Sequence, residues 1–270
     1  MKCLFSIEPY PSLCSSYSFN HIFGILSRCF NEVFWLFRGQ TINEFMQGNI
    51  NVDYYIIIDN IGENGRFVDV VTRMKKNGTK IVVVTYDPPN FKDIDVFDSK
   101  ELLNAVITFD KKFDKRFKCT QFIFDYMFDP KFIPTTVKTE YSNSVCIYGT
   151  IDGEGRGNRY NLTKIDDLGT DYNTLYNRIQ DYNGCHVFTP GLSEDGRTLI
   201  HYNKAKPIEI LLCGRNPYCE EGLDYLSYNK YLKTADMIPN PVPVDFDRNE
   251  ILSINESNVS LLKECIIHGI

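Results

Sequence analysis

The stretch Asp53-Tyr-Tyr-Ile-Ile-Ile-Asp59 is a continuous apolar run enclosed by two aspartates. Such a run is typical of a parallel strand that is covered on both faces, because a half-exposed strand would alternate apolar and polar residues. A second run, Lys80-Ile-Val-Val-Val-Thr85, follows an amphipathic segment over 63–77 that Asn77-Gly78 closes. Strand, helix and strand in this order predict a parallel sheet with a crossover helix.

The same alternation extends along the first half of the chain. Apolar side chains from Phe19 to Phe34 share one broad face behind a Ser15-Ser16 cap, which indicates a helix over 17–37. A Rossmann-like parallel sheet follows from this order of elements. We also expect strands over 2–7, 104–108 and 119–124, a short helix over 99–103 and a basic helical turn over 111–117.

The second half restarts the pattern after 129–142, a segment with two prolines and no periodicity. We expect strands over 144–148, 161–166, 185–189 and 215–219, helices over 171–182, 206–213 and 221–233, and a last helix over 256–267 after Asn255. The predicted fold class is therefore α/β with two Rossmann-like domains. Their ranges are 1–134 and 143–250, with a linker over 135–142 and a C-terminal helix in 251–270 that packs back.

The composition is that of a soluble globular protein with two domains of ordinary size. The chain has 270 residues, of which 43% are hydrophobic and 24% charged. Its formal net charge of −6 provides no global basic field, so attraction to nucleic acid requires a local patch. One cluster could form this patch, or could simply be a solvated helix face: Lys111, Lys112, Lys115, Arg116 and Lys118.

The positions of cysteine and histidine indicate neither disulfides nor a metal site. The nine cysteines form no Cys-x-x-Cys pair and most lie in apolar runs, which favours buried reduced thiols in a cytoplasmic protein. His21, His186 and His201 lack the spacing of metal ligands. Polar residues interrupt the aromatic segment 17–37, so no membrane span is expected.

A glycine-rich loop, 149–159, follows the expected strand 144–148 at its carboxyl end, where open α/β sheets bind ligands. It reads Gly-Thr-Ile-Asp-Gly-Glu-Gly-Arg-Gly-Asn-Arg. Gly149 lets the backbone approach a phosphate closely, and Arg156 and Arg159 can neutralise that phosphate. The loop matches neither the P-loop pattern nor Gly-x-Gly-x-x-Gly, and a turn with solvated arginines fits the same residues.

The segment 202–219 offers a second place for an anion. Lys204 and Lys206 lie at the start of the expected helix 206–213, whose N-terminus carries about half a positive charge. Glu209, just inside this helix, could accept hydrogen bonds from sugar hydroxyls. An amphipathic helix with a solvated basic start and Gly214 as its stop explains the same residues.

Two aspartates follow neighbouring strands. Asp87 comes after strand 80–85 and before Pro88-Pro89, so its carboxylate is placed to take a proton from an acceptor hydroxyl. Asp59 is a weaker candidate for the same role. The sequence Tyr-Asp-Pro-Pro is also an ordinary strand-ending turn, which leaves a purely structural interpretation open.

Together these residues resemble the GT-B glycosyltransferases, which pair two Rossmann-like domains facing a cleft and bind a nucleotide-sugar there. Val145–Thr150 is similar to the first strand and glycine turn of their donor domain, and Lys206–Pro217 to their Lys-x-x-Glu-x-Leu-x-x-Gly-x-x-Pro segment. The resemblance implies that Glu209 holds the donor ribose and that Lys206 meets the diphosphate. His201 stands where the retaining Glu-x7-Glu form has its first acid, which favours an inverting reaction.

A further resemblance is to the bacteriophage DNA β-glucosyltransferases. Ile147–Thr150 with the two loop arginines resembles their phosphate-binding strand, and Thr85–Pro89 resembles the strand end with their catalytic aspartate. This implies a transfer from a UDP-sugar that needs no metal or cofactor, with Asp87 as the base and a hydroxymethylated base in double-stranded DNA as the acceptor. On this basis 1–134 binds the acceptor and 143–250 the nucleotide-sugar. Transfer to a surface or capsid glycan, and a nucleotide-binding module without turnover, are the alternatives.

Overall fold

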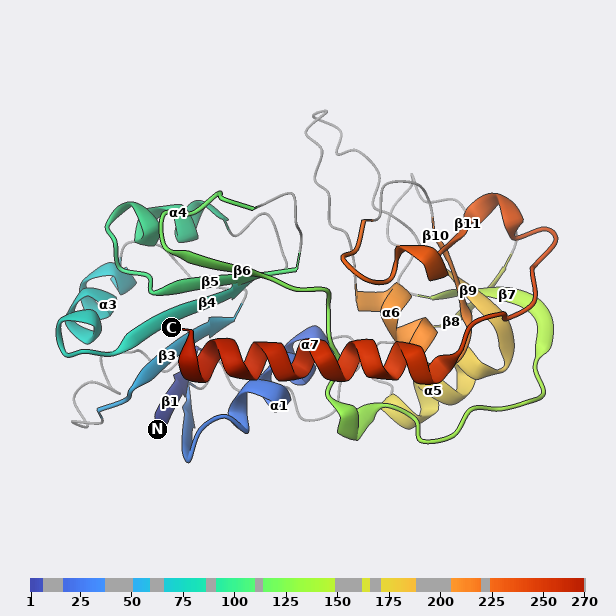
Figure 1. Cartoon of the computed structure of the whole chain (residues 1–270), viewed down its shortest axis with the longest axis horizontal. Coiled ribbons are helices and arrows are strands. Elements are labelled where there is room, and N and C mark those ends of the chain that lie inside the picture. The colour runs from blue at the N-terminus through green and yellow to red at the C-terminus, as the bar shows by residue number, and fades with distance from the viewer. Residues whose placement is uncertain are drawn as a thin grey trace. The chain divides into compact units, whose positions relative to one another are not determined.

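A computed structural model of the chain describes residues 1–6, 17–36, 51–58, 66–85, 91–109, 114–148, 162–165, 171–187, 205–219 and 224–269. Its tertiary contacts form two compact units, each with one sheet (Figure 1). Unit 1 combines Met1–Pro9, Phe23–Phe124 and Ser260–Ile270, and unit 2 combines Tyr10–Ile22 and Asp125–Val259. The chain therefore passes between the units several times, and neither unit is a single continuous range.

Unit 1 contains a six-stranded sheet with the order β2-β1-β3-β4-β5-β6, in which every described pair is parallel. The strands expected from the apolar runs are confirmed. They are β1 (Lys2–Phe5), β3 (Tyr54–Ile58), β4 (Lys80–Thr85), β5 (Ala105–Thr108) and β6 (Thr120–Ile123). The remaining strand, β2 (Glu32–Trp35), lies where the sequence predicts a helix. Strands β3, β4 and β5, inside the sheet, are buried almost throughout, which is why their sequences do not alternate.

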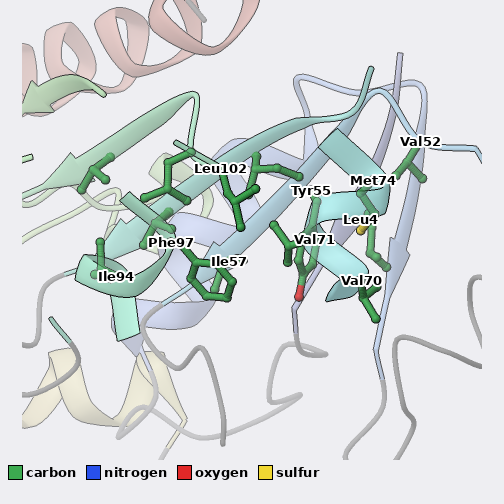
Figure 2. Packing of buried hydrophobic residues seen from close by; sticks show 14 of the residues in the cluster. Leu4, Val52, Tyr55, Ile57, Val70, Val71, Met74, Ile94, Phe97 and Leu102 are labelled. Atoms are coloured by element: carbon green, nitrogen blue, oxygen red, sulfur yellow. The ribbon is translucent and has the colours of Figure 1, made fainter. Parts of the chain in front are cut away.

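Both faces of this sheet are covered. Helices α3 (Arg66–Lys76) and α4 (Phe91–Ser99) lie on one face (Figure 1), and a hydrophobic cluster fills the space beneath them (Figure 2). On the other face, the ring of Phe5 lies 4.7 Å from that of Phe23 in α1 (Tyr17–Ser27). The hydroxyl of Tyr54 donates to the carbonyl of Ile266 in α7 (Arg248–His268) at 3.1 Å. The labelled members of the cluster are Leu4, Val52, Tyr55, Ile57, Val70, Val71, Met74, Ile94, Phe97 and Leu102.

Unit 2 contains a five-stranded sheet with the order β11-β10-β9-β7-β8, again parallel in every described pair. Helices α5 (Tyr172–Gln180) and α6 (Ala205–Leu212) pack on one face over a cluster that includes Cys146, Tyr148, Cys185 and Cys213. The strands are β7 (Ser142–Tyr148), β8 (Thr163–Ile165), β9 (Tyr182–Val187), β10 (Asn216–Cys219) and β11 (Lys233–Thr234). This order of strands and helices confirms the second Rossmann-like half.

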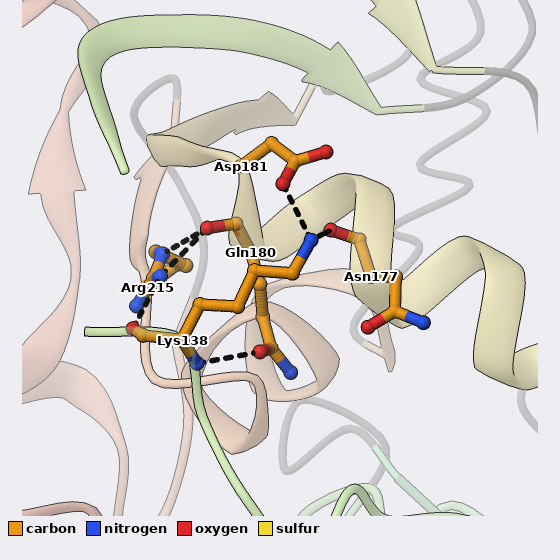
Figure 3. A network of polar contacts seen from close by, with 5 residues as sticks. All are labelled: Lys138, Asn177, Gln180, Asp181 and Arg215. Carbon is orange, nitrogen blue, oxygen red and sulfur yellow. Dashed lines mark hydrogen bonds and ion pairs between the residues drawn. The ribbon is translucent and has the colours of Figure 1, made fainter. Parts of the chain in front are cut away.

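A buried arginine fastens the segment that leads into β7. The guanidinium of Arg215 donates to the carbonyl of Gln180 at 2.6 and 3.1 Å and to that of Lys138 at 2.9 Å (Figure 3). The Lys138 ammonium in turn contacts the Asp181 carboxylate and the Asn177 carbonyl at 2.6 and 3.1 Å. Cations at these positions stabilise α5, because its last carbonyls have no intrahelical partner.

Three predictions for unit 1 are wrong. The helix expected over 17–37 ends at Ser27, because the backbone of 32–35 pairs with β1 and forms β2. The helix expected over 99–103 lies earlier in the chain as α4, and Glu101 has a φ of 56°, which a right-handed helix does not allow. The basic turn expected over 111–117 is not helical in its described part, 114–117.

Two predictions for unit 2 are also wrong. The region 224–234 forms the short 3-10 helix η5 (Asn229–Tyr231) and β11 instead of a helix, and the Asp125 carboxylate accepts the N–H groups of 226 and 227 at 2.7 and 2.6 Å. The C-terminal helix begins at Arg248 and not near 256, because Asp247 accepts the N–H of Asn249 at 2.8 Å and caps it. Asn255 lies inside this helix and is fully buried.

Candidate functional site

The carboxyl end of the second sheet brings three elements together in unit 2. Tyr148 is the last residue of β7, α6 carries Lys206 and Glu209, and α5 contributes Tyr176. The chain alternates strand and helix, so the N-terminus of α6 faces the edge at which β7 and β9 end. Cys146 and Tyr148 are two residues apart and therefore point to the same face, toward the helices.

Glu209 is a buried carboxylate that lies beside two tyrosines. Its side chain is 1% exposed, and its Oε2 accepts a hydrogen bond from the hydroxyl of Tyr148. The phenol of Tyr176 lies close enough to feel the charge of the same carboxylate. Burial and the negative charge of Glu209 raise the pKa of Tyr176 well above its usual value, so this phenol stays protonated and remains a donor.

Lys206 contacts the ring of the same tyrosine. Its ammonium is 4.5 Å from the centroid of the Tyr148 ring, a cation–π contact, and its side chain is 8% exposed. Tyr148 therefore contacts the cation through its ring face and the carboxylate through its hydroxyl. A cation and a hydrogen-bond acceptor held at the start of one helix can bind a ligand that combines a phosphate with a sugar.

The structure thus brings together two of the residues predicted from the sequence, Lys206 and Glu209. The other predicted site residues lie outside the described residues: Asp87, Gly149, Arg156, Arg159 and Lys204, together with the weaker candidate Asp59. Their roles stay predictions.

The predicted basic patch is described only in part, since Lys111 and Lys112 lie outside the described residues. Arg116 forms an ion pair with Asp95 at 2.8 Å, and Lys115 is exposed. The backbone N–H of Lys118 donates to the carboxylate of Asp98 at 2.8 Å. The described part of this segment therefore lies on the surface of unit 1, as a folded turn and not as a helix face.

His21 and His186 are buried and the described cysteines are buried or half-buried, whereas His268 is exposed near the end of α7. His21 is buried in unit 2, accepts the N–H of Asp129 at 3.0 Å and lies between the rings of Phe128 and Tyr172. Within the described ranges, no group of three His, Cys, Asp or Glu side chains could hold a metal ion, and all the described cysteines are free thiols. None of the described helices combines the length and the apolar character needed to cross a bilayer.

The contribution of two tyrosines was missed by sequence reasoning. Tyr148 stands directly before Gly149, so its place at the end of a strand could have suggested a side chain facing the site. Its partner Glu209 is 61 residues away, and no local pattern links the two. Tyr176 carries no signal in the sequence beyond its place on the apolar face of a helix.

No family model matches the chain, and no curated protein matches it significantly in sequence. Solved structures do share its fold. An "alpha-glucosyltransferase (AGT) in complex with UDP" aligns with a TM-score of 0.54 and 12% identity, over 97% of this chain and 90% of that one. The same coverage is found for an alpha-glucosyltransferase with UDP and a 13-mer DNA containing a central A:G mismatch (TM-score 0.53, 11% identity) and for one with UDP and a 13-mer DNA containing a HMU base (TM-score 0.51, 12% identity).

At such identities the likeness shows the fold alone. The α/β class with two Rossmann-like sheets, expected from the resemblance to the GT-B glycosyltransferases, is confirmed.

Proposed function

We propose that this chain is a glycosyltransferase that moves a sugar from a UDP-sugar to a hydroxymethylated base in double-stranded DNA. The observation that carries the proposal is the Lys206–Tyr148–Glu209 cluster at the carboxyl edge of the second sheet. It occurs in a fold shared over 97% of the chain with glucosyltransferases whose structures contain UDP. The sequence and the fold independently point to the same donor class.

In this proposal unit 2 binds the nucleotide. Glu209 accepts hydrogen bonds from the ribose hydroxyls, and Lys206 and the N-terminus of α6 attract the diphosphate. Gly149, Arg156, Arg159 and Lys204 are proposed from the sequence to complete the phosphate contacts. Loss of one such charged donor costs about 3 kcal/mol of transition-state stabilisation.

Asp87 is the proposed base. Its carboxylate takes the proton of the acceptor hydroxyl while the hydroxyl oxygen forms a bond to the anomeric carbon and the bond from that carbon to the diphosphate breaks. UDP leaves with the electron pair of the broken bond, and positive charges around the diphosphate stabilise it. This single displacement needs no metal or cofactor and inverts the anomeric carbon.

The inverting outcome can be tested by the anomeric configuration of the product. A UDP-sugar is α-linked, so inversion gives a β-linked base, which the proton coupling constant at the anomeric carbon identifies. An α-linked product would instead support retention, the outcome suggested by the names of the alpha-glucosyltransferases that share the fold.

Donor binding is tested by thermal shift with a panel of UDP-sugars. A ligand at a hundred times its dissociation constant stabilises the fold by about 2.7 kcal/mol. Lys206→Met should weaken UDP binding about tenfold, because it removes a charged contact, whereas Lys230→Met, at an exposed ion pair with Glu250, should not change it. Equal affinities in the two variants would contradict the assignment of Lys206.

Turnover and acceptor are tested separately. Asp87→Asn should keep UDP affinity and abolish transfer, and unchanged transfer would refute its role as base. Binding to a hydroxymethylcytosine duplex should weaken steeply with salt if phosphates are contacted. Absence of salt-dependent binding would refute DNA as the acceptor and would favour a glycan acceptor. A protein that binds UDP-sugar but never releases UDP would be a binding module.

A further inference from the structure

The side chain of Tyr148 contacts both Lys206 and Glu209, the two proposed ligand contacts, which are three residues apart on α6. Its hydroxyl donates to Glu209 Oε2, and its ring supports the Lys206 ammonium at 4.5 Å. The ring is itself fixed, because Tyr148 is 2% exposed and ends a strand that pairs with β8 and β9.

A buried carboxylate binds a sugar selectively only if its oxygens are held in one orientation. Rotation about the last bond of a glutamate side chain is broad, so an unsupported Glu209 would spread its acceptor sites over many directions. A hydrogen bond to an ionised group is shorter and stronger than a neutral one. A carboxylate can also accept several hydrogen bonds at once, so phenol and sugar hydroxyls can share it.

We propose that Tyr148 is a positioning residue for nucleotide recognition: its hydroxyl orients Glu209 toward the ribose while its ring orients Lys206 toward the diphosphate. This inference rests on the proposed function of the site. It goes further by assigning the preference for ribose to the Tyr148–Glu209 hydrogen bond and not to Glu209 alone. The phenol therefore stays in place when the nucleotide binds.

The test compares the dissociation constants of UDP and 2′,3′-dideoxy-UDP for the full chain. Two sugar hydroxyls donating to one carboxylate should give the wild type a preference of about a hundredfold for UDP. Tyr148→Phe keeps the ring and its contact with Lys206 and removes only the hydroxyl. It should lower the preference to about tenfold, a change that corresponds to 1.4 kcal/mol.

Tyr218→Phe is the matched control. Tyr218 is also a buried tyrosine of unit 2, and its hydroxyl donates to Asn183 Oδ1 at 2.7 Å, away from Glu209. A merely structural loss in either variant would lower the melting temperature and weaken both nucleotides equally. Only the loss of positioning changes their ratio, so the ratio in Tyr218→Phe should equal that of the wild type.

The outcomes separate the inference from the proposed function. A wild type that does not bind UDP overturns both. A wild type that binds UDP without preferring ribose overturns the ribose contact of Glu209 and the positioning role, but leaves the UDP-sugar donor standing. A wild type with a clear preference that Tyr148→Phe retains overturns only the positioning role. Tighter binding of UDP by Tyr148→Phe would show that the phenol competes with the sugar for Glu209, and this result would also overturn the positioning role.

A crystal structure of the wild type with UDP provides a second measurement that needs no variant. We expect the Tyr148 hydroxyl within hydrogen-bond distance of Glu209, and Glu209 within the same distance of the ribose. A Tyr148 ring that has swung away from Glu209 in this complex would refute the positioning role.

Discussion

Replacing Asn255 by aspartate separates two possible roles of this residue. The sequence suggests a helix N-cap at this position, and there Asn and Asp are about equally good. In the structure, Asn255 lies inside α7 and is fully buried. Its side-chain oxygen accepts the N–H of Phe128 at 2.8 Å, and its side-chain nitrogen donates to the carbonyl of Phe128 at 3.0 Å. The two roles predict different responses to the same substitution.

The expected loss of stability follows from these two hydrogen bonds. Asn255→Ala leaves a buried N–H and a buried carbonyl without a partner, at about 1–3 kcal/mol each, and regains at most about 0.7 kcal/mol of helix propensity. We therefore expect a loss of about 3 kcal/mol. Asn255→Asp keeps the acceptor but places a carboxylate oxygen against the Phe128 carbonyl, so we expect a loss of at least about 2 kcal/mol.

Urea unfolding at pH 7 measures this loss. The single tryptophan, Trp35, belongs to unit 1, so its fluorescence follows that unit, while far-UV circular dichroism follows both units. Asn255 and Phe128 both belong to unit 2, so the circular dichroism midpoint should fall more than the fluorescence midpoint. Ser257→Ala, at an exposed position of the same helix, is the control. An Asn255→Asp variant within about 0.5 kcal/mol of the wild type would refute the interior role.

Two further predictions concern backbone packing and pH. Gly184→Ala should destabilise unit 2 by about 3 kcal/mol or more, because the added Cβ would lie 2.1 Å from the carbonyl oxygen of Asn216 on the neighbouring strand. A denaturant midpoint close to that of the wild type would contradict this. His21 should make the stability of the fold depend on pH. Burial lowers the pKa of His21 to about 3, and the charges of Asp129 and Lys131 raise and lower this pKa as smaller effects. Below pH 6.5 the unfolded chain therefore takes up a proton that the folded chain does not, and the free energy of unfolding falls. The loss in the free energy of unfolding should be about 1.4 kcal/mol for each pH unit below 6.5. The difference in this free energy between wild type and His21→Asn should therefore narrow as the pH falls from 7 to 5. Parallel plots of unfolding free energy against pH for the two proteins would contradict this.

The strands of this protein could be predicted from the sequence because a buried parallel strand requires an unbroken apolar run. Residues 54–58 and 81–84 meet this requirement, and nothing in their surroundings opposes it. The helix expected over 17–37 was wrong because part of that segment pairs with a strand that is distant in the sequence. Residues 33–35 are as apolar as a helix face would be, but the backbone of 32–35 pairs with β1 at the start of the chain. Pairing between distant residues leaves no periodic signal.

The candidate site was predictable to the extent that it is local. Lys206, Glu209 and Gly214 lie within one helix and its stop, so their spacing was visible, and Gly214 does adopt a φ of 70°. Tyr148 and Tyr176 reach Glu209 from β7 and α5, and only the folded sheet brings them there. Asn255 shows the same limit: a residue with the chemistry of a cap was instead used to hold a backbone segment 127 positions earlier.

The division of α7 between the units has a consequence for biosynthesis. Residues up to Val259 contribute to unit 2, and those from Ser260 onward complete unit 1. The hydroxyl of Tyr54 obtains its acceptor, the carbonyl of Ile266, only when 212 further residues have been added. At usual elongation rates this delay is about 10 to 40 s. During that time the nascent first unit lacks the part of α7 that belongs to it, so chaperone holding should matter most before residues 260–269 emerge from the ribosome.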